Sequence, residues 1–576
     1  MSIEAIECDV LVIGGGLAGS YAAIKAKESG ADKVTLVSKG KLGKDGVSTF
    51  AAGVWAGGYS PEDDRETEFK KRALSESYGG GLYDEEWLDV FMDESYERLL
   101  ELDRWGVEWE KTPDGKYDRK ECRWKLLMCM FHGPQLMEAV ARKVIASGVR
   151  VIGHTMITDL LTENGKQEGR VTGAVGFDVR TGEFRVFNAR AIVMAAGGCG
   201  FKERVACYKF QTGEAAVMAY RAGAELGKFE VTETHSMTAT GFSTQGKNMF
   251  VGLGGKFVNA RGERFMFDYD TELEEHAGQS YISGAMAMEV RAGRGPIYLD
   301  MTHFTTEDVK KLRAVLPVPT RILERAGVMV GDRIVKKIEW APSLIGSVSL
   351  GGGIIANTKC ESSLVGLYAC GDAMARGPQL PSMIPGAAVT GARAGTSAAR
   401  YAKGAPDTRI DDKQVARLKK SACAAMERKD GFDPYHVIIG IQEVLTPYEV
   451  SLILREDRLE RAIKDIERIR DEEVPLLCAC DPHNLVIANE AVSMVLVAEM
   501  MLRSWLFRKE SRIGCLREDY PYVDNENWLK WTLLKQEGGK MKLWAKDIPP
   551  GRYKPDKARY LHPIFEAARK RGVAWG

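Results

Sequence analysis

The sequence predicts an α/β fold built on a Rossmann-like parallel sheet, with an inserted α+β unit and a helical C-terminal region. Three observations predict it. An apolar run, a glycine-rich turn and a helix follow one another in residues 8–28. A stretch of strands with short helices begins near residue 231, and long amphipathic segments dominate after residue 406.

The opening segment reads CDVLVIGGGLAG, and its apolar residues 10–13 are typical of a strand buried on both faces of a parallel sheet. Gly14, Gly16 and Gly19 then form a G-x-G-x-x-G pattern that leads into a helix over residues 20–28. These glycines permit a tight turn, close approach to a diphosphate and close helix–strand packing. The diphosphate would accept hydrogen bonds at the positive end of the helix dipole. The segment therefore predicts a dinucleotide cofactor.

Five further segments bear on which dinucleotide is bound, and they leave FAD open. A second strand, residues 33–38, ends in Ser38-Lys39, where an acidic residue usually binds the ribose of NAD. Residues 46–58 are small and suit a flat ligand, and residues 191–200 run from an apolar strand into a glycine-rich turn. A strand over 364–372 delivers Gly371-Asp372, and the helix 381–401 has an Ala/Gly-rich face. The N-terminus of such a helix stabilises negative charge on an isoalloxazine ring.

Composition excludes several other classes of function. Lys plus Arg and Asp plus Glu number 80 each, so net charge does not favour nucleic acid or an anionic membrane as partner. The 11 cysteines include no C-x-x-C and the 8 histidines are scattered, so no metal site is expected. No apolar run approaches the length of a membrane span, and the first eight residues do not resemble a signal peptide. A cytoplasmic protein is expected, with any membrane association made through partner subunits.

The order of elements predicts three domains. Helices are expected over residues 85–105 and 211–227, and residues 132–148 are expected to begin as a turn and become a helix. A meander of strands is expected over 149–152, 157–162, 170–177 and 183–188. Further helices are expected over 413–428, 456–473 and 489–507, followed by short strands and a last helix over 563–571. The predicted domains are 1–230 with 342–405 (cofactor binding), 231–341 (inserted) and 406–576 (helical, with a tail).

Four separated segments, GGGLAG, STFAAG, QTGEAAVMAYRAGAEL and GLYACGDAM, occur in the order typical of one family. A later segment, ESRIGCLREDYP followed by NWL, is similar to that family's E-S-R-G-x-H-x-R-x-D-x-P motif and N-W/F-L. The chain thus resembles the flavoprotein subunits of succinate dehydrogenase and fumarate reductase. The same superfamily includes L-aspartate oxidase and the flavoprotein subunit of adenylylsulfate reductase.

The resemblance implies an FAD-binding Rossmann-like domain, an inserted α+β capping domain and a C-terminal helical domain. It also implies hydride transfer at flavin N5 and an iron–sulfur partner subunit that exchanges electrons with the flavin. The His that binds FAD covalently in respiratory members is replaced by Ser48, so we expect non-covalent FAD. The expected FAD contacts are Gly14, Gly16, Gly19, Ser38, Lys39, Ser48, Thr49, Ala51, Ala52, Gly53, Ala195, Gly197, Gly198, Glu214, Gly371, Asp372, Pro385, Gly386 and Ala387.

The substrate positions depart from the family. His235 is retained, but the family's Thr-Glu pair aligns with Lys247-Asn248, and a second His aligns with Ser347. One substrate Arg aligns near Gln279, and the catalytic Arg aligns near Pro378, with Arg376 as a displaced substitute. A dicarboxylate needs paired cations when it is desolvated. We therefore expect His235 and Arg376 as catalytic residues, Lys247 and Asn248 as substrate contacts, and a substrate other than simple fumarate or succinate.

Two alternatives remain open. The chain could be similar to the flavoprotein of adenylylsulfate reductase, in which N5 attacks or releases sulfite. It could also be an electron-relay flavin module without a small-molecule substrate of its own. Of the motif residues in the helical domain, Arg512 is expected to connect that domain to the FAD domain, and Cys515 to be a packed thiol rather than a reactive one.

Overall fold

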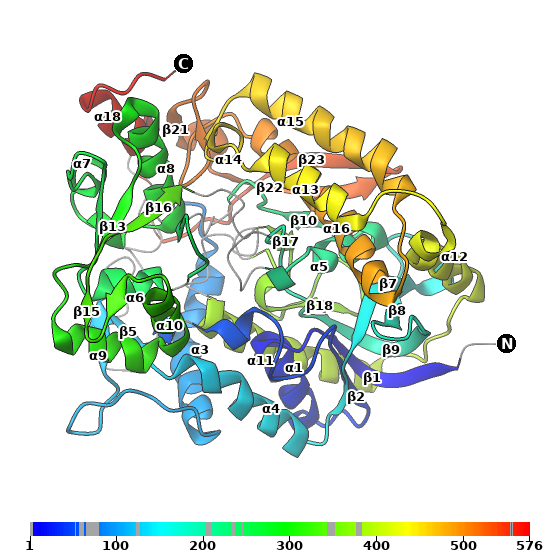
Figure 1. Cartoon of the computed structure of the whole chain (residues 1–576). Coiled ribbons are helices and arrows are strands. Elements are labelled where there is room, and N and C mark those ends of the chain that lie inside the picture. Colours follow the sequence, from blue (N-terminus) through cyan, green and yellow to red (C-terminus); the bar gives the residue numbers. More distant parts are fainter. Residues whose placement is uncertain are drawn as a thin grey trace.

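The computed structural model (Figure 1) describes residues 4–51, 53–56, 63–64, 80–121, 127–202, 209–231, 237–244, 246–342, 352–375, 383–552, 555 and 557–575. Its main sheet is centred on β1 (Ala5–Ile13), which pairs in parallel with β2 (Val34–Val37) on one side and β9 (Phe184–Met194) on the other. The sheet continues through β6 (Arg150–Ile152) beyond β2, and β18 (Leu367–Ala369) also pairs in parallel with β9. The Rossmann-like fold class is confirmed.

Two strands were expected here, one over 183–188 and one at the start of 191–200 that leads into a glycine-rich turn, but β9 is one continuous strand. Its first half pairs antiparallel with β8 (Val171–Asp178), which pairs in turn with β7 (Thr155–Thr162). Residues 186–194 of β9 also pair in parallel with β1. The three strands β7–β9 form the expected meander, whereas β6 joins the parallel part of the sheet instead. On the edge of β9 away from β1, the neighbour changes from β8 to β18. Because β1 pairs along the other edge, β9 continues through this change without a break.

Two helices cross the main sheet side by side. Helix α1 (Leu17–Glu28) packs along α11 (Met383–Gly404), and a Cβ on Gly391 or Gly395 would lie 2.3 or 2.1 Å from a carbonyl oxygen of α1. These distances leave room only for hydrogen, so the Ala/Gly-rich face predicted for this helix serves helix–helix contact. The remaining elements of this part are β3 (Val54–Ala56), α3 (Glu85–Arg104), β4 (Arg119–Glu121), β5 (Leu127–Met130), α4 (Leu136–Ala146) and α5 (Glu214–Ala222).

A four-stranded antiparallel sheet forms the centre of the inserted segment, drawn in green in Figure 1. Its order is β11 (Met237–Ala239), β16 (Ile338–Pro342), β13 (Tyr298–Asp300) and β12 (Lys256–Val258). Because β11 and β16 pair, the chain enters and leaves this unit at one place. Its other elements are α6 (Lys247–Gly252), α7 (Met266–Tyr269), α8 (Gln279–Glu289), α9 (Thr306–Val315), α10 (Pro317–Arg325), β14 (Met329–Val330) and β15 (Arg333–Ile334).

The C-terminal region is helical, as predicted. It contains α12 (Asp412–Cys423), α13 (Pro434–Leu445), α14 (Tyr448–Ser451), α15 (Glu456–Arg468) and α16 (Pro482–Phe507). Helix α16 corrects the expectation that no segment is long and apolar enough to span a membrane, since its length and composition suffice. It packs against α5, α13 and α15, and 78% of its most apolar stretch is buried inside the protein. Its apolarity is thus accounted for by a position in the core.

The tail joins all the other parts. The hairpin of β22 (Lys530–Glu537) and β23 (Lys540–Asp547) extends a sheet that includes β10 (Leu226–Gly227) and β17 (Gly353–Ile354). Small pairings of β19 (Ile453–Leu454) with β20 (Leu516–Arg517), and of β21 (Tyr522–Asp524) with β24 (Arg559–Leu561), flank α17 (Asn525–Trp528). The last helix, α18 (Pro563–Lys570), packs on α7 and α8 of the inserted unit.

Candidate functional site

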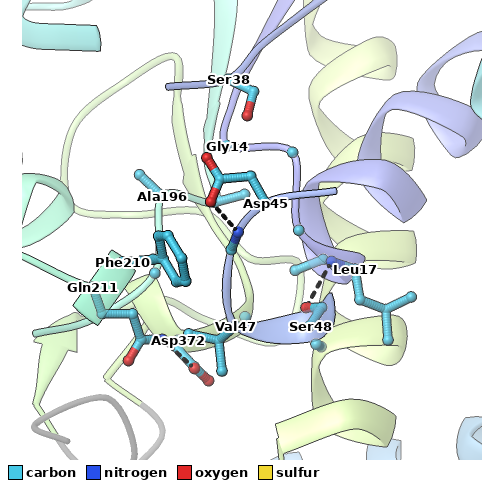
Figure 2. A pocket seen from close by; sticks show the side chains of 18 of the residues that line it. Gly14, Leu17, Ser38, Asp45, Val47, Ser48, Ala196, Phe210, Gln211 and Asp372 are labelled. Carbon is cyan, nitrogen blue, oxygen red and sulfur yellow. Dashed lines mark hydrogen bonds between the residues drawn. The ribbon is translucent and has the colours of Figure 1, made fainter. Parts of the chain in front are cut away.

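A large cavity lies where the carboxyl ends of β1, β2 and β9 meet the first turns of α1, α5 and α11. It encloses about 1660 Å³, counting the space that opens to solvent. Figure 2 shows Gly14, Leu17, Ser38, Asp45, Ser48, Phe210 and Asp372 around it. Of the expected contacts, it is lined by Gly14, Gly16, Ser38, Lys39, Ser48, Ala51, Ala195, Gly197, Glu214, Gly371, Asp372, Ala387 and, from the inserted unit, Asn248.

The turn between β1 and α1 is built for close backbone approach. Gly14 has φ +117°, and a Cβ there would lie 2.2 Å from the carbonyl oxygen of Ala195. A Cβ on Gly19 would lie 1.9 Å from the carbonyl oxygen of Gly14, so Gly19 packs the helix against the strand without lining the cavity. The N-cap of α1 is Gly16, which has no side chain to cap the helix. The start of α1 therefore presents backbone N–H groups to the cavity, which fits a diphosphate.

The segment after β2 forms the adjoining wall. Ser48, in the 3₁₀ turn Val47–Phe50, accepts a hydrogen bond from the Leu17 N–H at 3.1 Å (Figure 2). Thr49 instead donates to the carbonyl of Gly46 and does not line the cavity. Gly53 packs against Val315 of the inserted unit, and Ala52 lies outside the described residues.

Lys39 lines the cavity but does not offer it a free ammonium group. Its Nζ donates to Thr212 Oγ1 at 3.1 Å, to Glu214 Oε1 at 2.8 Å and to Glu490 on α16. Burial alone would lower the pKa of Lys39, but Glu214 and Glu490 raise it above its ordinary value. Beside Lys39, the cavity wall thus carries the carboxylate of Glu214, which reaches it from the start of α5.

The opposite wall comes from the end of β18 and the start of α11. Asp372 Oδ2 accepts a hydrogen bond from Gln211 Nε2 at 2.9 Å (Figure 2). Gly371 has φ +62°, and its N–H donates to the Thr390 hydroxyl of α11 at 2.9 Å. Ile384 and Ala387 line the cavity from α11, whereas Gly198, Pro385 and Gly386 do not.

Several lining residues were missed from the sequence. Asp45, Phe210 and Gln211 line the cavity, as does part of β7, Thr155–Ile157. Gln211 is the first residue of the recognised segment QTGEAAVMAYRAGAEL, so its position could have been noticed. Residues of β7 carry no local signal, because only the folding of the meander brings them to this edge.

The structure describes only some of the residues that were predicted to contact substrate or take part in catalysis. His235 and Arg376 lie outside the described residues, as do Ser347 and Pro378. Lys247 is buried in α6, where its Nζ donates to the carbonyl of Glu275 at 3.3 Å. Asn248, the next residue, lines the cavity, and its Oδ1 is buried with no hydrogen-bond partner among the described residues. Gln279 is buried at the first turn of α8.

The motif residues of the helical domain form a buried network. Arg512 donates to the carbonyl of Gly80 and to both oxygens of Glu510, which connects the tail to the first part of the chain as expected. Arg517 donates to the carbonyls of Trp505 and Arg508 and to Asp519. Cys515 is buried, and this burial raises its pKa to about 12, which fits a packed thiol and not a thiolate.

Comparison with known families decides what kind of protein this is. Residues 9–386 match the model described as FAD binding domain, and residues 442–560 match the one described as fumarate reductase flavoprotein C-term. The chain belongs to the fumarate reductase and succinate dehydrogenase flavoprotein family. It is an FAD-dependent oxidoreductase, and the cofactor and family predicted from the sequence are confirmed.

Individual relatives cover nearly the whole flavoprotein. An uncharacterised FAD-dependent oxidoreductase of Methanocaldococcus jannaschii is 28% identical over 565 residues, with 94% of this chain and 98% of the relative covered. One of the subunits of the fumarate reductase (CoM/CoB) of Methanothermobacter marburgensis is 28% identical over 564 residues, with 93% and 98% covered. Adenylylsulfate reductase from Archaeoglobus fulgidus superposes with a TM-score of 0.79 at 25% identity, covering 95% of this chain and 96% of that one.

The cavity of this flavoprotein fits FAD. Two features carry that conclusion. One is the start of α1, where the N-cap Gly16 has no side chain and a Cβ on the neighbouring Gly14 would clash. The other is the acidic Glu214 at the first turn of α5. The first suits the diphosphate, and a carboxylate suits ribose or ribityl hydroxyl groups as a hydrogen-bond acceptor. The assignment of individual residues to parts of FAD stays a prediction.

Proposed function

We propose that this chain is the flavoprotein component of an oxidoreductase that acts on a substrate other than fumarate or succinate and exchanges electrons with an iron–sulfur partner. The bound flavin supplies hydride or electron transfer. The protein's own residues bind and orient the substrate and move its proton. His235 and Arg376 are the proposed catalytic residues, and Lys247 and Asn248 are proposed to contact substrate.

The observation that carries the proposal is the side chain of Asn248. The resemblance places a Glu at this position, next to a Thr, and here a neutral amide lines the cavity with its Oδ1 buried and unpartnered among the described residues. An unpartnered buried acceptor is costly, so a ligand that donates a hydrogen bond there gains affinity. A carboxylate of a dicarboxylate has no proton to donate at neutral pH.

The charge around the described part of the cavity also disfavours a dicarboxylate. The lining side chains include the carboxylates of Asp45, Glu214 and Asp372. Lys39 is the one lining Lys or Arg in the described ranges, and two carboxylates already neutralise it. The described ranges of the cavity therefore offer a substrate carboxylate no unpaired cation.

A partner subunit is supported by the name of one relative, and the iron–sulfur character of that partner is part of our proposal. The protein from Methanothermobacter marburgensis is named as one subunit of its enzyme, hence as one component of a complex. The sequence of the present chain has no C-x-x-C. Electrons would then reach or leave the flavin through a separate protein.

The deciding experiment uses the flavin-loaded protein reduced without oxygen. Mixing it with fumarate is expected to leave the flavin reduced, as judged by its absorbance, with no succinate formed. Rapid reoxidation together with succinate would overturn the proposal and would make Arg376 the leading proton donor. An authentic fumarate reductase flavoprotein, treated in the same way, is the positive control.

Adenylylsulfate reduction is the second candidate function, because the Archaeoglobus fulgidus enzyme shares the fold over 95% of this chain. A related solved structure is described as a covalent adduct with sulfite. Adenylylsulfate added to the reduced protein would then reoxidise the flavin and release AMP and sulfite. A third outcome is that neither fumarate nor adenylylsulfate reoxidises the flavin and that only a co-purifying iron–sulfur protein does. This outcome would support an electron-relay module.

A further inference from the structure

The three N–H donors of Lys39 are all engaged by protein groups. They go to the hydroxyl of Thr212 and to the carboxylates of Glu214 and Glu490. Thr212 also donates to Glu214 Oε1 at 2.7 Å. Since an ammonium group has three donors, Lys39 acts here on Glu214 and not on a ligand.

Glu490 comes from a distant part of the chain. It lies in α16, the core helix of the helical region, 451 residues after Lys39. Its second oxygen, Oε2, pairs with Lys202 at 2.7 Å, and only 4% of the residue is exposed. Helix α16 also packs against the start of α5, where a Cβ on Gly213 would lie 2.7 Å from Val497. None of the described residues that line the cavity belongs to α16.

The four charged groups balance one another. Burial alone would raise the pKa of Glu490, but Lys39 and Lys202 lower it below its ordinary value, so this carboxylate is ionised. Without Glu490, the partly buried Lys39 and Lys202 would face Glu214 alone. Removing one member of a buried charge network leaves the others uncompensated and able to shift.

We propose that Glu490 is a positioning residue for the FAD site: it fixes Lys39, which in turn fixes the Glu214 carboxylate at the cavity wall. Occupancy of the FAD site and packing of α16 are thereby linked, although the described residues of α16 do not line the cavity. By reciprocity, FAD stabilises α16 around Glu490, and loss of the Glu490 charge weakens FAD binding.

The test compares two substitutions on one helix. Glu490→Gln is expected to raise the FAD dissociation constant about tenfold, measured by titrating the apoprotein and following flavin fluorescence. Glu499→Gln is the matched control, because Glu499 is equally buried on α16 and pairs with Arg470 and Arg503 instead. It is expected to lower the melting temperature of the apoprotein without changing the FAD dissociation constant.

A double-mutant cycle separates positioning from general destabilisation. In a Lys39→Met background, Glu490→Gln is expected to have little further effect on FAD affinity, because the link to Glu214 is already broken. An unchanged FAD affinity in Glu490→Gln, an equal loss in Glu499→Gln, or full additivity with Lys39→Met would each overturn the proposal.

A measurement on the unaltered protein covers the case in which Glu490→Gln does not fold. FAD is expected to slow amide hydrogen exchange around residues 486–494 of α16 more than around residues 498–506. The proposal would also be contradicted if FAD protected residues 486–494 and 498–506 equally, or protected neither.

Discussion

Arg571, which follows α18, and Glu289, the last residue of α8, are joined by two parallel hydrogen bonds. Arg571 Nε donates to Glu289 Oε1 at 2.8 Å and Nη2 donates to Oε2 at 3.0 Å. The Glu289 carboxylate is fully buried and also accepts hydrogen bonds from Nε and Nη2 of Arg294. An ion pair with a carboxylate that is closed to solvent thus connects the tail to the inserted unit.

Replacing Arg571 tests this fastening. Arg571→Met is expected to lower the free energy of unfolding by about 1–2 kcal/mol, less than the loss of an isolated buried pair, because Arg294 still compensates Glu289. Urea unfolding followed by circular dichroism measures it. The control is Arg569→Met, because Arg569 is an exposed arginine near the end of α18. Equal unfolding midpoints for the two variants would show that the pair contributes nothing.

Because His562 is buried, we expect the free energy of unfolding to depend on pH. Burial, together with nearby Arg512, lowers its pKa to about 3. Between pH 6.5 and 3 the unfolded chain therefore binds a proton that the folded chain does not, so stability falls as pH falls through this window. From about pH 7.5 to about pH 5.0 this residue accounts for a loss of about 2 kcal/mol.

The variant His562→Asn isolates that contribution. Asparagine does not titrate, yet it can still cap α18 in place of His562 Nδ1, which accepts from the Ile564 N–H. Unfolding free energies at about pH 7.5 and about pH 5.0 should differ by about 2 kcal/mol less in the variant than in the original protein. His303→Gln, at an exposed position, should leave the difference unchanged. A steep pH dependence that survives His562→Asn would refute the assignment.

Gly14 predicts a specific loss of FAD. A methyl group there would lie 2.2 Å from the carbonyl oxygen of Ala195, at φ +117°. Gly14→Ala is expected to reduce bound FAD per protein at least about tenfold, as read from the ratio of flavin to protein absorbance. Gly106→Ala shares a positive φ of +89° but meets no atom within 4 Å, so it should retain its flavin. Full flavin content in Gly14→Ala would mean that this turn is not the diphosphate site.

Ser48 predicts that FAD is released on denaturation. Its hydroxyl accepts from the Leu17 N–H, and a serine at this position cannot form the histidyl bond of the respiratory enzymes. Acid precipitation should therefore leave all flavin in the supernatant, measured by its fluorescence. Flavin retained in the washed pellet would reveal a covalent bond and would point to another residue.

The parts of this flavoprotein that could be predicted in advance are those with a local cause. Gly14, Gly16 and Gly19 have their spacing because one turn and one helix must approach a ligand and a strand. The apolar run of β1 and the periodicity of α3 and α15 likewise follow from neighbours along the chain. Helix α13 and the continuity of β9 were not predicted, since both depend on partners that periodicity does not show.

The family, the cofactor and the order of elements can all be inferred from consecutive residues, because turn geometry and hydrophobic periodicity are local properties of the chain. The identity of the acidic group near the end of β2 depends on tertiary packing instead. Lys39 was expected to face the cofactor, and its charge is directed onto Glu214 by Glu490, 451 residues away. Contacts between charges so distant in sequence exist only after the sheet and α16 have packed together, and burial then makes their pairing strong.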